Sequence, residues 1–183
     1  MTRIIDAKLI TDTVKDLFIK ANTCLRPDIL AGLKQARKNE TKEKPRYALD
    51  VIIKNAFIAK KKMLAICQDT GMAVVYLKIG QSLMVRGSIK KAVEKGVALA
   101  YKDFYLRKSI VEDPLIRENT NTNLPPIIYT DIVSGNRINI KVVVKGFGCE
   151  NVSKIKMFKP TETARDIEKF VVESVKEAGS RPC

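Results

Sequence analysis

The sequence predicts an α+β fold, in which a helical N-terminal segment packs on a mixed, mainly antiparallel sheet with further helices. Apolar residues recur at helical spacing in the first third of the chain, and β-rich runs of strand length appear after it. With 183 residues, of which 45% are hydrophobic, the chain can fill a real core. We expect one domain over 1–183, mainly helical over 1–62 and mixed over 63–183.

Three helices are predicted in the N-terminal segment. Residues 4–20 carry an apolar stripe at helical spacing, and Asp28 can open a second helix. The third helix, over 47–61, is strongly basic at its end, where the lysine run 60–62 complements the helix dipole. A polar connection separates the second helix from the third.

Strand and helix patterns follow one another in the middle of the chain. The run AVVYLKIG, residues 73–80, is rich in β-branched residues and has strand length, whereas residues 90–106 return to helical spacing. The polar loop EDPLIRENTNTNLPP follows, and proline bounds it at its end. Loops of this kind often carry binding residues.

The last third predicts two strands and a helix. Residues 127–133 and 137–146 are predicted to pair as an antiparallel hairpin around the turn SGN, because apolar and polar residues alternate along the second run. A final helix is predicted to begin near Thr161 or Thr163 and to end at Gly179.

The charge balance is strongly basic, with 34 Lys and Arg against 20 Asp and Glu and a formal net charge of +14. Such a balance fits nucleic acid, an anionic membrane or acidic small molecules. The basic residues are scattered, however, and no aromatic stripe lies between them, as a platform for single strands would need. We therefore expect mostly a solvated surface and no nucleic acid, and keep a basic nucleic-acid-binding module as an alternative.

Cysteine and histidine usage narrows the chemistry. The four cysteines form no CxxC pair, and the chain has no signal peptide and no apolar run of the roughly 18 residues that a membrane span needs. We expect a cytoplasmic protein with free thiols, which leaves thiolate chemistry and metal ligation open. The absence of histidine excludes Ser-His and Cys-His catalysis and most zinc sites.

The segment CQDTG, residues 67–71, is the first candidate site. It places a thiol beside a carboxylate, with a glycine that lets the backbone approach a ligand closely. The alternative makes Cys67 a small buried hydrophobe and Asp69 part of a turn before a strand. Two further segments strengthen the functional interpretation: KGFGCEN at 145–151 and NTNTNLPP at 119–126.

With these segments the sequence resembles the N-terminal part of the class I fumarase and L(+)-tartrate dehydratase family, the iron–sulfur hydro-lyases. In two-subunit members this part is the α-type subunit. The resemblance runs essentially end to end. It is carried by CQDTG (67–71), YLRKSIVEDPL (105–115), the pattern N-T-x-x-N-x-P from Asn119 to Pro125, KGFGCENVSKIKMFKP (145–160) and EAGSRPC (177–183).

The resemblance implies a [4Fe–4S] cluster held by three cysteine thiolates, with one iron left open for substrate. Cys67 and Cys183 match two of these ligands, and the third belongs to a stretch that this chain does not contain. The implied reaction is reversible removal of water from a small 2-hydroxy dicarboxylic acid, either malate to fumarate or tartrate to oxaloacetate, with the open iron as Lewis acid.

The resemblance also implies roles for single residues. Asp69 matches a catalytic carboxylate beside the substrate hydroxyl, and Arg107 matches an arginine that clamps a substrate carboxylate. The alternatives are a turn carboxylate and a surface arginine. The residues expected to bind substrate are Gln68, Asp69, Thr70, Arg107, Gly146 and Gly148, with Asn119 expected to shape the pocket.

Three departures from the family pattern bear on competence. Cys149 stands where the family usually has serine and is expected to be a free thiol, and Phe147 replaces a glycine and could narrow the pocket. The chain is also short, so we expect a C-terminal truncation that is not competent alone. It would need a β-type subunit or a C-terminal domain, in an oligomer. A truncated, catalytically inert family member remains the alternative.

Overall fold

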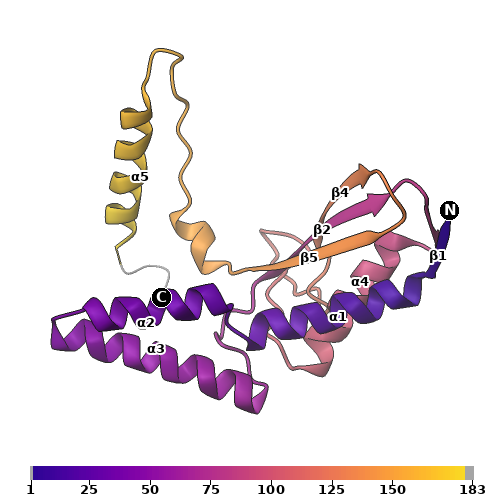
Figure 1. Ribbon diagram of the computed structural model, residues 1–183, viewed down its shortest axis with the longest axis horizontal. Coiled ribbons are helices and arrows are strands. Elements are labelled where there is room, and N and C mark those ends of the chain that lie inside the picture. The colour runs from indigo at the N-terminus through magenta and orange to yellow at the C-terminus, as the bar shows by residue number, and fades with distance from the viewer. Residues whose placement is uncertain (1, 180–183) are drawn as a thin grey trace. The chain divides into compact units, whose positions relative to one another are not determined.

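The computed structural model describes residues 2–179, apart from the side chains of 149 and 150. The chain divides into two compact units, residues 1–145 and residues 146–183. Helices combine with parallel and antiparallel strands, which confirms the α+β class. The first unit contains β1 (Arg3–Asp6), α1 (Ala7–Thr23), α2 (Pro27–Asn39), α3 (Glu43–Lys62), β2 (Met72–Gly80), β3 (Leu83–Arg86), α4 (Ile89–Asp103), β4 (Ile127–Val133) and β5 (Ile138–Lys145) (Figure 1).

The first helix begins later than its apolar stripe predicts. Residues 3–6 form β1, which pairs in parallel with β3, and Asp6 then caps α1 by accepting a hydrogen bond from the Lys8 amide at 2.7 Å. The start predicted at residue 4 is therefore wrong, because strand pairing and a cap occupy that stretch. In α3 the predicted lysine run does lie in the last turn.

The main sheet has three strands in the order β4-β2-β5. β2 pairs in parallel with β4 and antiparallel with β5, so the predicted hairpin between 127–133 and 137–146 is wrong. The two strands are neighbours in sequence but flank β2. The connection between them crosses the end of β2, where the Gly80 amide donates to Arg137 O at 2.8 Å. A Cβ atom at Gly80 would lie 2.4 Å from Gly135 O, so this crossing requires glycine.

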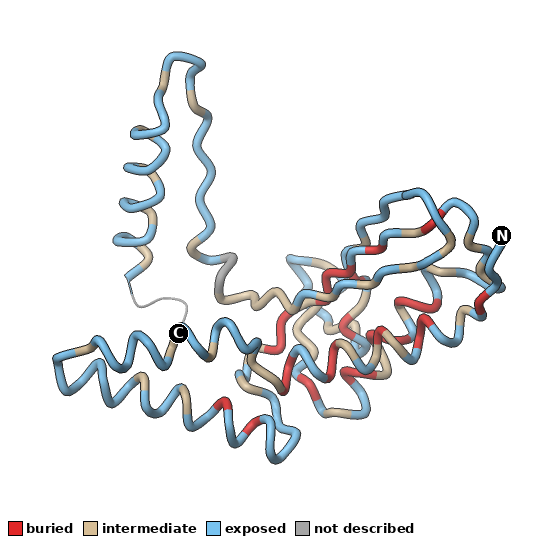
Figure 2. Tube along the Cα trace, in the orientation of Figure 1, coloured by how far each residue is buried: buried red, intermediate tan, exposed pale blue. Residues whose placement is uncertain are grey.

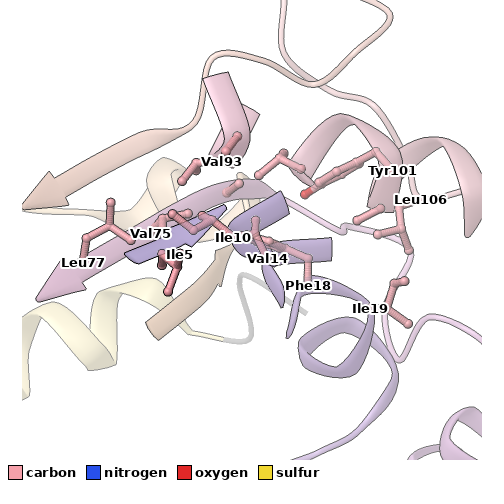
Figure 3. Close-up of a cluster of buried hydrophobic side chains, with 14 residues drawn as sticks. Ile5, Ile10, Val14, Phe18, Ile19, Val75, Leu77, Val93, Tyr101 and Leu106 are labelled. Atoms are coloured by element: carbon pink, nitrogen blue, oxygen red, sulfur yellow. The ribbon is translucent and has the colours of Figure 1, made fainter. Parts of the chain in front are cut away.

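Helices α1 and α4 pack together and cover one face of this sheet (Figure 1). The close approach depends on Gly96, where a Cβ atom would lie 2.6 Å from Thr11 O and 2.9 Å from Val14 Cβ. The Thr11 hydroxyl also donates to Ala92 O at 3.1 Å, joining the two helices. Figure 3 shows the resulting cluster, whose members include Ile5, Ile10, Val14, Phe18, Ile19, Val75, Leu77, Val93, Tyr101 and Leu106.

The α2–α3 helix pair is mostly exposed, as Figure 2 shows. Helix α2 has no buried residue, and α3 buries only Ala56 and Ala59. An ion pair between Arg37 and Asp50 links the two helices at 2.9 Å. Among the described residues, no helix is both long enough and apolar enough to cross a membrane.

The second unit contains the 3₁₀ helix η1 (Gly148–Val152) and the helix α5 (Ala164–Ala178). A capping box opens α5, with the Thr163 amide donating to Asp166 Oδ2 at 2.7 Å. Gly179 follows the last helical residue with φ of +63°. Of the two predicted starts, Thr161 and Thr163, the structure has Thr163, and the predicted end at Gly179 is confirmed. The rings of Phe158 and Phe170 pack edge to face 5.7 Å apart.

Candidate functional site

The CQDTG segment forms the loop between α3 and β2. The residue before it is anchored twice: the Ile66 amide donates to Asn22 O at 2.8 Å, and the Asn55 side chain donates to Ile66 O at 2.8 Å. Cys67 comes next, with a free thiol on an exposed side chain. The predicted thiol is therefore open to solvent and does not pack as a buried hydrophobe.

The second half of the loop turns sharply into β2. The Gly71 amide donates to Asp69 Oδ1 at 3.0 Å, and Gly71 has φ of +58°, in the left-handed region that favours glycine. Asp69 is half-buried, whereas Gln68 beside it is exposed. Cys67, Gln68 and Asp69 are thus consecutive in a loop that hydrogen bonds fix at both ends.

Two predicted site residues meet through a backbone contact. Thr70 is only 2% exposed, and its hydroxyl donates to Arg107 O at 2.9 Å. Arg107 follows α4 in the chain, and its side chain is exposed. The hydrogen bond ties the loop that carries Cys67 and Asp69 to the segment that carries Arg107.

Two residues that sequence reasoning missed complete this junction, Tyr101 and Asn123, and both are 0% exposed. The Tyr101 hydroxyl lies 2.6 Å from Thr70 O and 2.8 Å from Gly71 O, and donates its one proton to this pair of carbonyls. The Asn123 side chain donates to Gly71 O at 2.9 Å. Figure 3 shows that the Tyr101 ring belongs to the apolar cluster, so its hydroxyl joins core and loop.

Asn123 also holds the segment after Arg107. Its Oδ1 accepts from the Ser109 amide at 2.8 Å and from the Ile110 amide at 3.1 Å. The predicted pocket residue Asn119 acts nearby, donating to Lys108 O at 3.0 Å. Both asparagines belong to the N-T-x-x-N-x-P pattern. The pattern could have indicated Asn123, but nothing in it says which amide is buried.

The environment of Tyr101 keeps its hydroxyl protonated. Burial raises the pKa of Tyr101 well above its ordinary value, and the nearby Asp69 carboxylate raises it further. A hydrogen bond from the Asn123 side chain opposes this shift. At neutral pH Tyr101 is therefore a hydrogen-bond donor, as its two carbonyl contacts require.

The remaining predicted site residues belong to the second unit or lie outside the described residues. Cys183 lies outside the described residues, and so does the side chain of Cys149. Gly146 and Gly148 belong to the second unit, where Gly148 opens η1. Within the part of the chain that the structure describes, no three His, Cys, Asp or Glu residues gather as a metal site.

Comparison with known proteins places this chain in a family. A family model for fumarate hydratase (fumerase) matches residues 11–183. The chain belongs to the fumarate hydratase family. The match takes in CQDTG, Arg107 and Asn123, so the loop and both segments tied to it lie inside the family's region. The predicted family is confirmed.

Curated relatives include both kinds of enzyme that the sequence resembles. The chain is 35% identical over 181 residues to a putative L(+)-tartrate dehydratase subunit alpha of Methanocaldococcus jannaschii, covering 95% of this chain and 63% of that protein. It is 30% identical over 188 residues to the anaerobic class I fumarate hydratase of Escherichia coli, and the match covers 98% of this chain and 33% of that protein. Fumarate hydratase 2 of Leishmania major is 31% identical over 164 residues, and the match covers 86% of this chain and 28% of that protein. The chain thus spans less than two thirds of the length of these relatives.

Proposed function

We propose that this chain is part of a hydro-lyase that reversibly removes water from a small 2-hydroxy dicarboxylic acid. The observation that carries the proposal is the partly buried hydrogen bond from the Thr70 hydroxyl to Arg107 O, at 2.9 Å. It joins the loop of Cys67 and Asp69 to the segment of Arg107. A thiol, a carboxylate and a guanidinium therefore belong to two directly bonded segments of a fumarate hydratase family member.

Removal of water from a hydroxy diacid sets definite tasks for these residues. The substrate carries two carboxylates, and the planar guanidinium of Arg107 is suited to bind one of them through two parallel hydrogen bonds. The exposed side chain of Arg107 is accessible for this contact. The departing hydroxyl needs a proton, which a carboxyl group at Asp69 can hold or transfer. Gln68 and the backbone at Thr70 would line the same site.

Among the described residues, Cys67 fits the role of one ligand of an iron–sulfur cluster. The free, exposed thiol of Cys67 has the donor chemistry that such clusters use. In the proposal Cys183 supplies a second thiolate, and another cysteine of the complete enzyme supplies the third. When bound, the cluster supplies a Lewis-acidic iron. Gly146 and Gly148 remain proposed as backbone that lines the substrate pocket.

The proposal includes a partner. Two relatives are named as subunit alpha of tartrate dehydratases, which supports a β-type subunit, or the corresponding C-terminal domain, as the completing part. Assembly as an oligomer and location in the cytoplasm, where thiolate ligands stay reduced, belong to the same proposal.

The proposal is tested by anaerobic assay of the protein together with its β-type partner against malate, fumarate and tartrate. We expect hydration or dehydration of at least one of them. Arg107→Lys should lower kcat/KM by about tenfold or more, mainly through KM, because lysine loses the bidentate contact. Arg117→Lys is the matched control, since the Arg117 Nε atom donates only to the nearby Pro114 O, at 3.3 Å. Inactivity towards all three acids, or equal effects of the two substitutions, would refute the proposal.

A further inference from the structure

We infer that Tyr101 and Asn123 are positioning residues, whose side chains fix the backbone of the CQDTG loop against the segment of Arg107. The inference deepens the proposed function and depends on it for its chemistry. Neither side chain reaches solvent, since both residues are 0% exposed. They would therefore act through the loop, without touching substrate.

The argument begins with the Gly71 carbonyl. This single oxygen is reached by the Tyr101 hydroxyl at 2.8 Å and by the Asn123 side-chain amide at 2.9 Å. The same hydroxyl reaches Thr70 O at 2.6 Å. Two successive carbonyls, at the point where the loop enters β2, are thus held by buried side chains that come from α4 and from the loop before β4.

Burying the Tyr101 hydroxyl and the Asn123 amide costs free energy, which indicates that these polar groups have a structural role. A buried hydroxyl or amide is unfavourable unless it is hydrogen-bonded, and an apolar ring or chain of similar size would fill the same space. Tyr101 packs within the apolar cluster, where phenylalanine would serve for packing alone. The polar atoms are explained by the carbonyls that they hold.

The loop consequently has two anchors with the functional residues between them. At one end Ile66 is held by Asn22 O and by the Asn55 side chain. At the other end Thr70 and Gly71 are held by Tyr101 and Asn123. Only Cys67, Gln68 and Asp69 lie between the anchors. Their positions depend on both ends, and displacements of about 1 Å at a reacting group can cost about a hundredfold in rate.

Asn123 extends this control to the opposite side of the site. Its Oδ1 accepts from the Ser109 and Ile110 amides while its Nδ2 donates to Gly71 O. One side chain thus sets the spacing between the loop of Asp69 and the segment that begins at Arg107. The proposed proton donor and the proposed carboxylate clamp are held in register by the same amide group.

The test uses amide hydrogen exchange, which requires no activity. Tyr101→Phe removes only the hydroxyl, and Asn123→Gly removes the side chain without straining its φ of +60°. Either change should accelerate exchange at the Gly71 amide by about tenfold. Exchange at the Ile66 amide, held by the other anchor, should stay unchanged. Equal acceleration at both amides, or none at Gly71, would overturn the inference.

Two control variants separate positioning from general stability. Ser109→Ala removes a buried hydroxyl that has no hydrogen-bond partner in the described structure, so Gly71 exchange should not change. Val93→Ala makes a cavity in the core at a residue 0% exposed, and should lower global stability without selecting Gly71. Selective acceleration at Gly71 in Val93→Ala would overturn the inference.

The active complex with the β-type partner supplies the second readout. Tyr101→Phe should lower kcat with little change in KM, because Asp69 is displaced whereas the Arg107 side chain remains. An unchanged kcat beside faster Gly71 exchange would refute the positioning role. Faster Gly71 exchange in a complex that acts on no hydroxy diacid would instead refute the proposed function, while the loop anchoring would stand.

Discussion

Replacement of Tyr101 by phenylalanine should lower stability in a way that depends on pH. The ring still fills its place in the core, but the hydroxyl that reaches Thr70 O and Gly71 O is lost. Loss of one partner of a buried hydrogen bond costs about 1–3 kcal/mol. Urea unfolding at pH 7 should therefore show a loss of about this size in the free energy of unfolding of Tyr101→Phe.

The pH dependence follows from the raised pKa of Tyr101. In the unfolded chain a tyrosine loses its proton near pH 10, whereas folded Tyr101 keeps it to higher pH. Above about pH 10 the unfolded state therefore binds fewer protons, and stability falls by about 1.4 kcal/mol per pH unit through this group. This contribution is fully present below pH 10 and lost as pH rises towards the folded pKa.

Unfolding of the wild type and Tyr101→Phe should therefore be compared at pH 7 and pH 11. The stability difference between them should shrink by about 1 kcal/mol at the higher pH, because only the wild type carries the titrating group. Tyr105, which is 95% exposed, provides the control, and Tyr105→Phe should leave the free energy of unfolding at pH 7 unchanged. A difference equal at both pH values, or no loss at pH 7, would refute the reasoning.

Three further predictions concern other parts of the chain. Gly96→Ala should destabilise the first unit by about 1–3 kcal/mol, because the added Cβ would lie 2.6 Å from Thr11 O. Gly32→Ala should stabilise the same unit by up to about 1 kcal/mol, because nothing lies within 4 Å of the added Cβ. Thermal unfolding of both variants tests this, and equal shifts in Tm would contradict it. Thr163→Ala should lower the stability of α5 by about 1 kcal/mol through loss of the capping box, and unchanged helix content on heating would count against it. Peptide-resolved alkylation should modify exposed Cys67 before half-buried Cys24, and the reverse order would contradict the exposure of the loop.

Local sequence signals predicted where the helices lie, apart from the start of α1. The ends of α5 follow from Thr163 and Gly179, each of which satisfies backbone groups that only a helix terminus leaves open. The fold class also follows from apolar spacing. These features depend on residues within a few positions of one another, which is the range over which sequence patterns are informative.

The strand pairing could not be predicted in the same way. Residues 127–133 and 137–146 look like a hairpin because they are close in sequence and joined by a turn. Which strand lies between them is decided by burial: β2 carries Ala73, Val75 and Leu77 into the core and takes the central position. Alternation within β4 and β5 gives no information about a strand that lies about fifty residues earlier.

In the candidate site too, residues with a local sequence signal were predicted and residues that depend on distant contacts were not. Cys67 and Asp69 were predicted as candidate site residues from five consecutive letters, and the turn at Gly71 was the alternative interpretation of the same letters. Tyr101 and Asn123 were not predicted, because a tyrosine at the end of an amphipathic helix and an asparagine among four polar neighbours look ordinary in sequence. Their importance arises from burial and from partners 30 to 52 residues away.

The central claim is that Cys67 belongs to the catalytic site of a hydro-lyase. The most direct test measures anaerobic turnover of malate, fumarate and tartrate by the complex with the β-type partner, in Cys67→Ser and in Cys24→Ser. Cys24 is the control because its free thiol is half-buried at the end of α1 and is not one of the proposed cluster ligands. The account predicts that Cys67→Ser abolishes turnover while Cys24→Ser retains it. Turnover that survives in Cys67→Ser would contradict the account.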